Sequence, residues 1–391
     1  MAEKKRRARG EGSIRQRKDG TWEARFITGV DPGTGKDIRK SVYAKTQKEV
    51  RKKMTEAIAA LDREDYREPC KMTLAQWLDI WSTEYLKNVK PRTLESYLCQ
   101  IKNHIKPNLG AVKLEALSTH AIQVFYNHLG EGRDSKPGLS PKSIKIVHGV
   151  LHKALEQAVA IGYLRFNPAD ACTLPRVVRK DLEPLDEDAT VRFMEAVKGH
   201  QYEAVFLVTL FTGMRQGEVL GLSWDCVDFA KGTITINKQL QKAPGGGSVY
   251  NLIPTKNSKG RTVTPAPFVM DLLRPKRRQQ TEWRLKAGPL WTDSGLVFTN
   301  ELGGHLMPHT VYHNYKKIVA GIGLPNARFH DLRHSYAVAA IRSGDDIKTV
   351  QGNLGHATAA FTLDVYGHVT DQMKRESANR MQQYIDRVSN G

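Results

Sequence analysis

The spacing of apolar residues changes along this 391-residue chain and divides it into three stretches. Up to about residue 65, short segments alternate with turn residues. Beyond that point, apolar residues recur every three or four positions, which is typical of amphipathic helices. A chain of this length exceeds one ordinary hydrophobic core, so two or three domains are expected. The pattern predicts a multidomain, mainly α protein with small β sheets.

The first stretch predicts a three-stranded sheet followed by one helix. Asp19-Gly20 is a strong hairpin signal between segments 13–18 and 21–27, and a further strand is expected over 37–43. A helix is expected over 46–61 from its apolar spacing. The strands carry the basic residues Arg15, Arg17, Arg25 and Arg39. Such a sheet can enter a DNA major groove, and a solvated basic sheet is the equal alternative.

The second stretch, 72–173, predicts a helical domain. Helices are expected to begin after Thr73, at Pro91, after Ser118 or Thr119, and at Ser140-Pro141. The basic candidates for phosphate contact are Lys90, Arg92, Lys142 and Lys145, although each alone is typical of an ordinary surface. The next segment, 174–184, contains Arg176, Arg179 and Lys180 between prolines, which indicates an extended linker able to cross a groove.

The third stretch, 185–391, predicts a mostly helical domain with a β insertion. Strands are expected over 232–239, 248–254 and 261–265, which places Lys256 in a turn. A last helix is expected over 370–388, and its apolar residues lie near one face. That face either packs on its own domain or docks on another protomer.

Charge and composition indicate a nucleic-acid partner. Sixty Lys and Arg against 41 Asp and Glu give a formal net charge of +19, which favours a polyanion such as DNA or RNA. No apolar run reaches the roughly 20 residues of a membrane span, and no apolar segment follows the basic start. The four cysteines are far apart and match neither a zinc site nor a disulfide framework. A cytoplasmic location is therefore expected.

An ordered set of polar residues in the last stretch indicates phosphodiester chemistry: Arg215, Lys256, His330, Arg333, His356 and Tyr366. Cleaving a phosphodiester requires a nucleophile, charge stabilisation on the oxygens and a proton for the leaving group. Arginine forks match phosphate geometry, which suits Arg215 and Arg333 to the second task. Lys256 is the candidate proton donor, with His356 as another donor. Tyr366 is the candidate nucleophile, with His330 as its base.

Each signal alone has an ordinary alternative. Arg215 and Glu218 are spaced for a simple i,i+3 ion pair. Lys256 could be a solvated turn residue, His356 could end a helix, and Tyr366 competes with core tyrosines. The order of all six residues is what favours a catalytic set.

The six residues, taken in this order, resemble the catalytic set of the tyrosine recombinase family, also called phage integrases. The neighbouring segments agree: Thr212-Gly213-Met214-Arg215, His330-Asp331-Leu332-Arg333-His334, Leu354-Gly355-His356 and Asp364-Val365-Tyr366. The residues around Asp19-Gly20 resemble the arm-binding domain of integrases from conjugative transposons and temperate phages. The resemblance implies an arm-type DNA-binding domain over 1–65, a SAM-like core-binding domain over 72–173, a basic linker over 174–184 and a mixed α/β catalytic domain over 185–391.

The resemblance also implies a mechanism and partners. Tyr366 would form a 3′-phosphotyrosyl link to double-stranded DNA, and strand exchange would pass through a Holliday junction. Because the adduct keeps the bond energy and the set offers cations in place of a carboxylate cluster, neither a cofactor nor a metal is expected. Glu218 would orient Arg215. A tetramer would bind core and arm-type sites, with an excisionase or DNA-bending protein left open as a partner, and no membrane is involved.

Three functions stay open at this point. The first is an integrase that inserts and excises a mobile element. The second is a related enzyme, either a resolvase of chromosome dimers or a type IB topoisomerase. The third is a DNA-binding regulator that no longer cleaves. The N-terminal sheet argues against the simple resolvase, and the intact residue set argues against the regulator.

Overall fold

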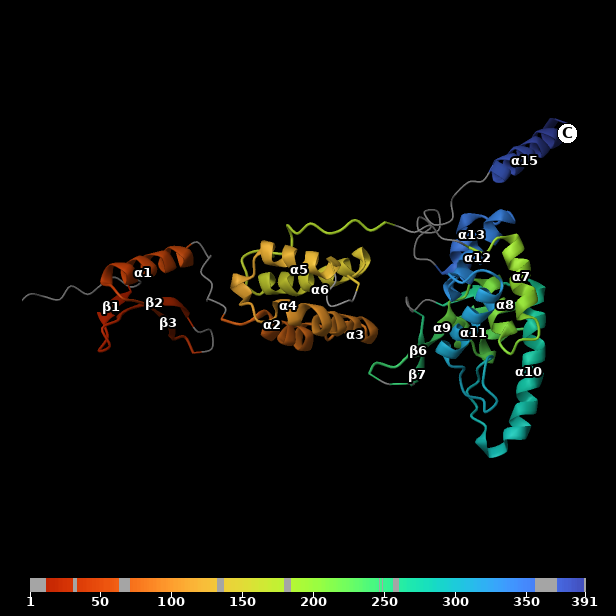
Figure 1. Cartoon of the computed structure of the whole chain (residues 1–391), viewed down its shortest axis with the longest axis horizontal. Coiled ribbons are helices and arrows are strands. Elements are labelled where there is room, and N and C mark those ends of the chain that lie inside the picture. The colour runs from red at the N-terminus through yellow and green to blue at the C-terminus, as the bar shows by residue number, and fades with distance from the viewer. Residues whose placement is uncertain are drawn as a thin grey trace, which may run out of the picture. The chain divides into compact units, whose positions relative to one another are not determined.

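A computed structural model describes residues 12–30, 34–62, 71–131, 137–178, 184–245, 247, 249–255, 260–355 and 371–389. The chain divides into two compact units, Met1–Val177 and Val178–Gly391. It is mainly helical with small antiparallel sheets (Figure 1), as predicted. Within the described residues, no helix is both long and apolar enough to cross a membrane.

The N-terminal part is a three-stranded antiparallel sheet with one helix against it. The elements are β1 (Ser13–Gln16), β2 (Trp22–Val30), β3 (Asp37–Ala44) and α1 (Gln47–Asp62), and the strand order is β1-β2-β3. The predicted turn is confirmed: Asp19 Oδ1 accepts the Thr21 N–H at 3.0 Å, and Gly20 has φ of 81°. Ala24, Ala44 and Val50 form the small core between sheet and helix. Because side chains alternate across a strand, the other face is left to Arg15, Arg25 and their neighbours.

The helical part that follows has its own core. Its elements are α2 (Leu74–Ile80), a π-helical turn (Trp81–Tyr85), α3 (Pro91–Gln100), a second π-helical turn (Ile101–Ile105), α4 (Lys106–Leu109), a 3₁₀ turn (Leu114–Ala116), α5 (Thr119–Glu131) and α6 (Pro141–Ala160). Thr73 caps α2, Ser140 caps α6, and Ser118 accepts the Ala121 N–H before α5, so the predicted starts are confirmed. Trp77 is fully buried, and its Nε1 donates to the Ala154 carbonyl at 2.9 Å.

The second unit is mainly helical. The helices are α7 (Glu187–Val197), α8 (Glu203–Thr212), α9 (Gln216–Leu220), α10 (Pro267–Ala287), α11 (Pro308–Gly321), α12 (Phe329–Arg342), α13 (Ile347–Leu354) and α15 (Asp371–Ser389), with 3₁₀ turns at Trp224–Cys226 and Gly288–Leu290. Residues 204–210 of α8 are buried on every side. A helix that is apolar all round lies inside a domain, and α8 therefore forms the centre against which α10 and α12 pack.

The β insertion differs from the prediction of a single strand over 232–239. The strands are β4 (Val227–Asp228), β5 (Thr233–Ile236), β6 (Lys238–Lys242), β7 (Tyr250–Pro254) and β8 (Arg261–Val263). β5 pairs with β4 and β8, whereas β6 leaves that sheet at Asn237 and pairs with β7. The break is fixed because the Asn237 carbonyl accepts the Thr255 N–H at 3.1 Å. Gly221 also lets β6 approach α9 closely, since a Cβ there would lie 2.6 Å from the Leu240 nitrogen.

The last helix, α15, confirms the predicted C-terminal helix within one residue of its expected bounds. Met381, Tyr384, Ile385 and Val388 are 45–59% exposed on it. The helix therefore presents an apolar stripe.

Candidate active site

Arg215 stands at the junction of two helices in the second unit. α8 ends at Thr212, Gly213 is left-handed with φ of 64°, and Arg215 begins α9 as its N-cap. A Cβ at position 213 would lie 2.5 Å from the Tyr336 ring and 2.7 Å from Leu354. Both the positive φ and this crowding require glycine. The resulting turn leaves the Arg215 side chain 37% exposed.

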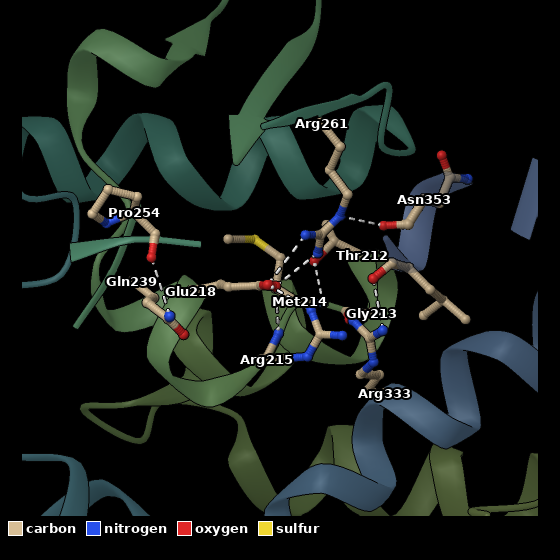
Figure 2. Close-up of polar contacts among 11 residues, drawn as sticks. Thr212, Gly213, Met214, Arg215, Glu218, Gln239, Pro254, Arg261, Arg333 and Asn353 are labelled. Atoms are coloured by element: carbon tan, nitrogen blue, oxygen red, sulfur yellow. Dashed lines mark hydrogen bonds and ion pairs between the residues drawn. The ribbon is translucent and has the colours of Figure 1, made fainter. Parts of the chain in front are cut away.

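Glu218 lies behind Arg215 and is 2% exposed. Figure 2 shows its carboxylate between two arginines: Arg215 Nη1 donates to Oε1 at 2.8 Å, and Arg261 Nη2 donates to Oε2 at 2.7 Å. Burial raises the pKa of Glu218, but hydrogen bonds and charge from Arg261, followed by those of Arg215, outweigh burial and lower this pKa to about 2. Glu218 is therefore ionised. Its contact with Arg215 is the one expected from the sequence.

Arg333 comes from α12 and is 1% exposed. Its Nη1 donates to the Gly213 carbonyl at 2.7 Å and its Nη2 to the Leu354 carbonyl at 2.6 Å (Figure 2). These bonds join the turn before Arg215 to the last residue of α13. Of the two arginines expected to hold phosphate, Arg215 is the partly exposed one and Arg333 the buried one.

His330 lies one helical turn before Arg333 on α12 and is exposed. Partial desolvation of the ring by neighbouring protein atoms is the main cause that lowers the pKa of His330, and the charges of Arg333 and Arg215 add to it. Asp331 opposes this shift. A neutral imidazole can accept a proton, as a general base must. Since residues three positions apart share one side of a helix, His330 lies on the side of α12 from which Arg333 reaches the turn at Gly213.

His334, one turn further along α12, is 8% exposed, and its ring centroid is 4.8 Å from that of His330. Burial, and then the neighbouring His330, lower the pKa of His334 to about 4, while Asp331 opposes this shift and Arg328 and Arg333 add to it. The N-terminal end of α12 is held by Arg328, whose Nη2 donates to Asp331 at 2.8 Å.

We expect this histidine to make the second unit less stable in mild acid. Because the unfolded chain takes up the proton near pH 6.5 and folded His334 only near pH 4, stability should fall as pH drops through that window. The full shift corresponds to roughly 3 kcal/mol, of which about 2 kcal/mol is lost between pH 7 and pH 5. Urea-dependent hydrogen exchange of α12 at pH 7 and pH 5 measures it. His334→Gln should flatten the difference, and an unchanged difference in that variant would contradict the assignment.

Lys256, His356 and Tyr366 lie outside the described residues, as do Arg179 and Lys180 of the linker. Their assignments stay predictions. The described residues end at Thr255, just before Lys256, and at Gly355, just before His356.

Two residues of these networks were missed from the sequence. Arg261 is the second partner of Glu218. The sequence feature that could have indicated it is a basic residue at the start of a predicted strand, five positions after Lys256. Glu23 lies on the arginine face of the N-terminal sheet, where its carboxylate accepts Arg15 Nε at 2.7 Å and Arg25 Nε at 2.9 Å. The hydrogen bond from Arg15 is the main cause that lowers the pKa of Glu23 to about 2. Strand alternation would have placed Glu23 among these arginines.

The basic residues predicted to contact DNA are all exposed where the structure describes them. Arg15, Arg17, Arg25 and Arg39 lie on the sheet, and Arg17 also stacks over the Tyr43 ring at 5.4 Å. The others are Lys90, Arg92, Lys142 and Lys145 of the helical part and Arg176 of the linker. Arg92 is paired with Glu95 at 2.7 Å, which is an ordinary surface interaction.

These features define a class of protein. A partly exposed arginine and a buried arginine meet around the turn at Gly213, and His330 lies one helical turn before the buried one, in a chain with a net charge of +19. Such a site suits a phosphate group whose negative charge grows during reaction. It is typical of an enzyme that acts on nucleic acid.

Comparison with known proteins agrees with this class. Residues 183–373 match the Phage integrase family, and residues 73–130 match the phage integrase N-terminal SAM-like domain. A tyrosine recombinase XerC-like protein of Caldanaerobacter subterraneus subsp. tengcongensis is 32% identical, covering 89% of this chain and 92% of that protein. The ICEBs1 integrase of Bacillus subtilis is 25% identical, covering 94% of this chain and 99% of that protein.

Solved structures show the same fold. The Tn1549 transposon integrase in complex with transposon right end DNA has a TM-score of 0.67 at 20% identity, covering 80% of this chain and 100% of that chain. A lambda integrase tetramer bound to a Holliday junction has a TM-score of 0.57 at 19% identity, covering 94% and 99%. The chain belongs to the phage integrase family, the tyrosine recombinases. It is a site-specific recombinase that cleaves and rejoins DNA.

Proposed function

We propose that this recombinase integrates and excises a mobile genetic element, and that it does so in the cytoplasm with Tyr366 as nucleophile. The observation that carries the proposal is the network joining Arg215, Glu218 and Arg333 around Gly213. It presents one cationic site next to His330. Relatives named as integrases of ICEBs1 and of the Tn1549 transposon match most of the chain, which supports a mobile element as the substrate.

Each residue has a proposed task. Arg215 donates to the non-bridging oxygens of the scissile phosphate, and buried Arg333 adds positive charge while it fixes the turn before Arg215. His330 takes the Tyr366 proton, since its lowered pKa keeps the ring neutral. Lys256 protonates the leaving 5′ oxygen, and His356 donates a further hydrogen bond to the phosphate.

The covalent step balances without an external energy source. The phenolate oxygen of Tyr366 bonds to phosphorus, the bond to the 5′ oxygen breaks, and that oxygen leaves as a hydroxyl. The 5′-hydroxyl of a partner duplex then attacks the phosphotyrosyl bond and releases Tyr366. Two rounds produce and resolve a Holliday junction. The bond energy stays in the adduct, so the reaction needs neither ATP nor a metal ion.

Four protomers are proposed to act on two duplexes. The exposed stripe on α15, formed by Met381, Tyr384, Ile385 and Val388, supports docking on a neighbouring protomer. The SAM-like region is proposed to bind the core site, with the linker over 174–184 completing the grip on DNA. The domain over 1–65 is proposed to bind separate arm-type sites.

The arginine face of the sheet yields a prediction for those sites. Arg25→Ala should weaken arm-site binding about 10-fold or more, because a bidentate arginine–guanine contact is worth roughly 1–3 kcal/mol. Its neighbour Glu23 holds Arg25 in place at 2.9 Å. Electrophoretic mobility shifts at several salt concentrations measure the loss, while core-site cleavage should stay unchanged.

A matched control lies on the opposite side of the sheet. Lys52 is on α1 and its side chain is 78% exposed, so Lys52→Ala removes one charge without touching the arginine face. Equal losses in Arg25→Ala and Lys52→Ala would mean that charge alone acts. Equal binding of core-site and arm-site DNA by the N-terminal domain would contradict its assignment as an arm-binding domain.

The proposed chemistry is tested with nicked suicide duplexes carrying the ends of the element. The nick lets the short 5′-hydroxyl strand diffuse away, which traps the covalent complex. A denaturing gel should show a protein–DNA adduct without added metal or ATP, and peptide mapping should find it on Tyr366. Tight binding with no adduct on any cognate end would favour a DNA-binding regulator instead.

A further inference from the structure

Arg261 opens β8 and contacts segments of the second unit that are far apart in sequence. Its Nε donates to the Asn353 carbonyl at 2.7 Å, and its Nη1 and Nη2 form a fork on Glu218 at 3.1 and 2.7 Å. The side chain is 12% exposed. It also lies against Gly355, where a Cβ would come within 3.0 Å of Arg261 Cδ. A residue held in this way is not an ordinary surface cation.

The Glu218 carboxylate is shared evenly between two arginines. Oε1 accepts Arg215 Nη1 and Arg261 Nη1, whereas Oε2 accepts the Arg215 backbone N–H and Arg261 Nη2. Arg215 therefore gives a single side-chain nitrogen to the carboxylate. Within the part of the chain that the structure describes, its guanidinium makes no other hydrogen bond. An arginine facing an unshared carboxylate commonly forms two parallel bonds with it.

The charges of the three groups lead to the same conclusion. Arg215 and Glu218 alone form a pair with no net charge, whereas the triad with Arg261 carries +1. A buried carboxylate without a second cation would draw Arg215 inward and cancel much of its field. Charge placed in advance at the site is what stabilises a transition state with growing negative charge.

We propose that Arg261 is a positioning residue for strand cleavage: it occupies Glu218 so that Arg215 keeps its outer donors and its charge for the scissile phosphate. This inference rests on the proposed function, in which Arg215 holds that phosphate. Arg261 itself stays beneath the surface and need not touch DNA. Its second task is to hold the Asn353 carbonyl, which keeps the end of α13 in place beside the Arg333 bond to Leu354.

The test compares single-turnover cleavage of a suicide duplex by Arg261→Gln, Arg261→Lys and the double variant Glu218→Gln with Arg261→Gln. Arg261→Gln should cleave about 100-fold more slowly or worse, the usual loss when one preorganised donor fails, while core-site affinity changes little. The double variant should recover at least about 10-fold, because removing the carboxylate frees Arg215 again. Arg261→Lys keeps the charge without the fork of two nitrogens, so its cleavage rate should lie between those of Arg261→Gln and the double variant.

Arg284→Gln is the matched control, since it removes one exposed charge of the same unit at a side chain that is 63% exposed. Melting temperatures accompany every rate. If Arg261→Gln does not fold, the double variant and Arg261→Lys still decide the matter. If the double variant cleaves no faster than Arg261→Gln, Arg261 has a purely structural role and the inference is overturned. Where Arg261→Gln is unfolded, the same conclusion follows if the double variant cleaves no faster than Arg261→Lys. An absent adduct with the wild-type protein would instead overturn the proposed function, and Arg261 with it.

Discussion

Tyr366→Phe is expected to lower the rate of covalent attachment to DNA by about 10⁴-fold or more, the scale seen when a nucleophile is removed. The substitution deletes only the phenolic oxygen that would bond to phosphorus. The ring and the cationic groups stay, so binding to the core site should be unchanged. Single-turnover cleavage of a suicide duplex measures the rate, and mobility shifts measure the affinity.

Tyr312→Phe is the control for this substitution, since Tyr312 is a partly exposed tyrosine of α11 in the same unit. It should cleave at the wild-type rate. An adduct that persists in Tyr366→Phe would show that another tyrosine is the nucleophile. Loss of both binding and cleavage would show that Tyr366 has a structural role.

Arg333→Lys is expected to reduce cleavage by about 10³-fold and to cost about 2 kcal/mol of stability. The guanidinium bridges the Gly213 and Leu354 carbonyls at 2.7 and 2.6 Å, and it is 1% exposed. A lysine ammonium is a single point of charge that cannot span both carbonyls in this fixed geometry. The turn before Arg215 and the end of α13 would then no longer be joined by hydrogen bonds to one side chain.

Single-turnover cleavage and the melting temperature measure the two effects of Arg333→Lys. Arg284→Lys on α10 is the control, because that side chain is mostly exposed and pairs loosely with Asp293 at 3.6 Å. Wild-type cleavage in Arg333→Lys would show that a charge is sufficient and that the two carbonyl bonds are not needed.

Local signals predicted the secondary structure well where the deciding atoms are close in sequence. Thr73 and Ser140 each accept a backbone N–H from their own first helical turn, and Asp19-Gly20 closes its hairpin within a few residues. The prediction of one continuous strand over 232–239 was wrong because the deciding contacts are distant in sequence. Its break at Asn237 depends on pairing with β8 and on the close approach of α9 to β6, and neither partner is local.

Local sequence patterns were sufficient to predict the helices, the hairpin and the basic character, and the order of six reactive residues indicated the recombinase family. Residue type and short-range spacing carry that information. Two contacts depend instead on packing: Arg333 is buried against Gly213, 120 positions away, and Arg261 bonds Glu218 across 43 positions. Sequence spacing cannot reveal such pairs, because they form only when α8, α12 and β8 pack together and exclude water from the charges between them.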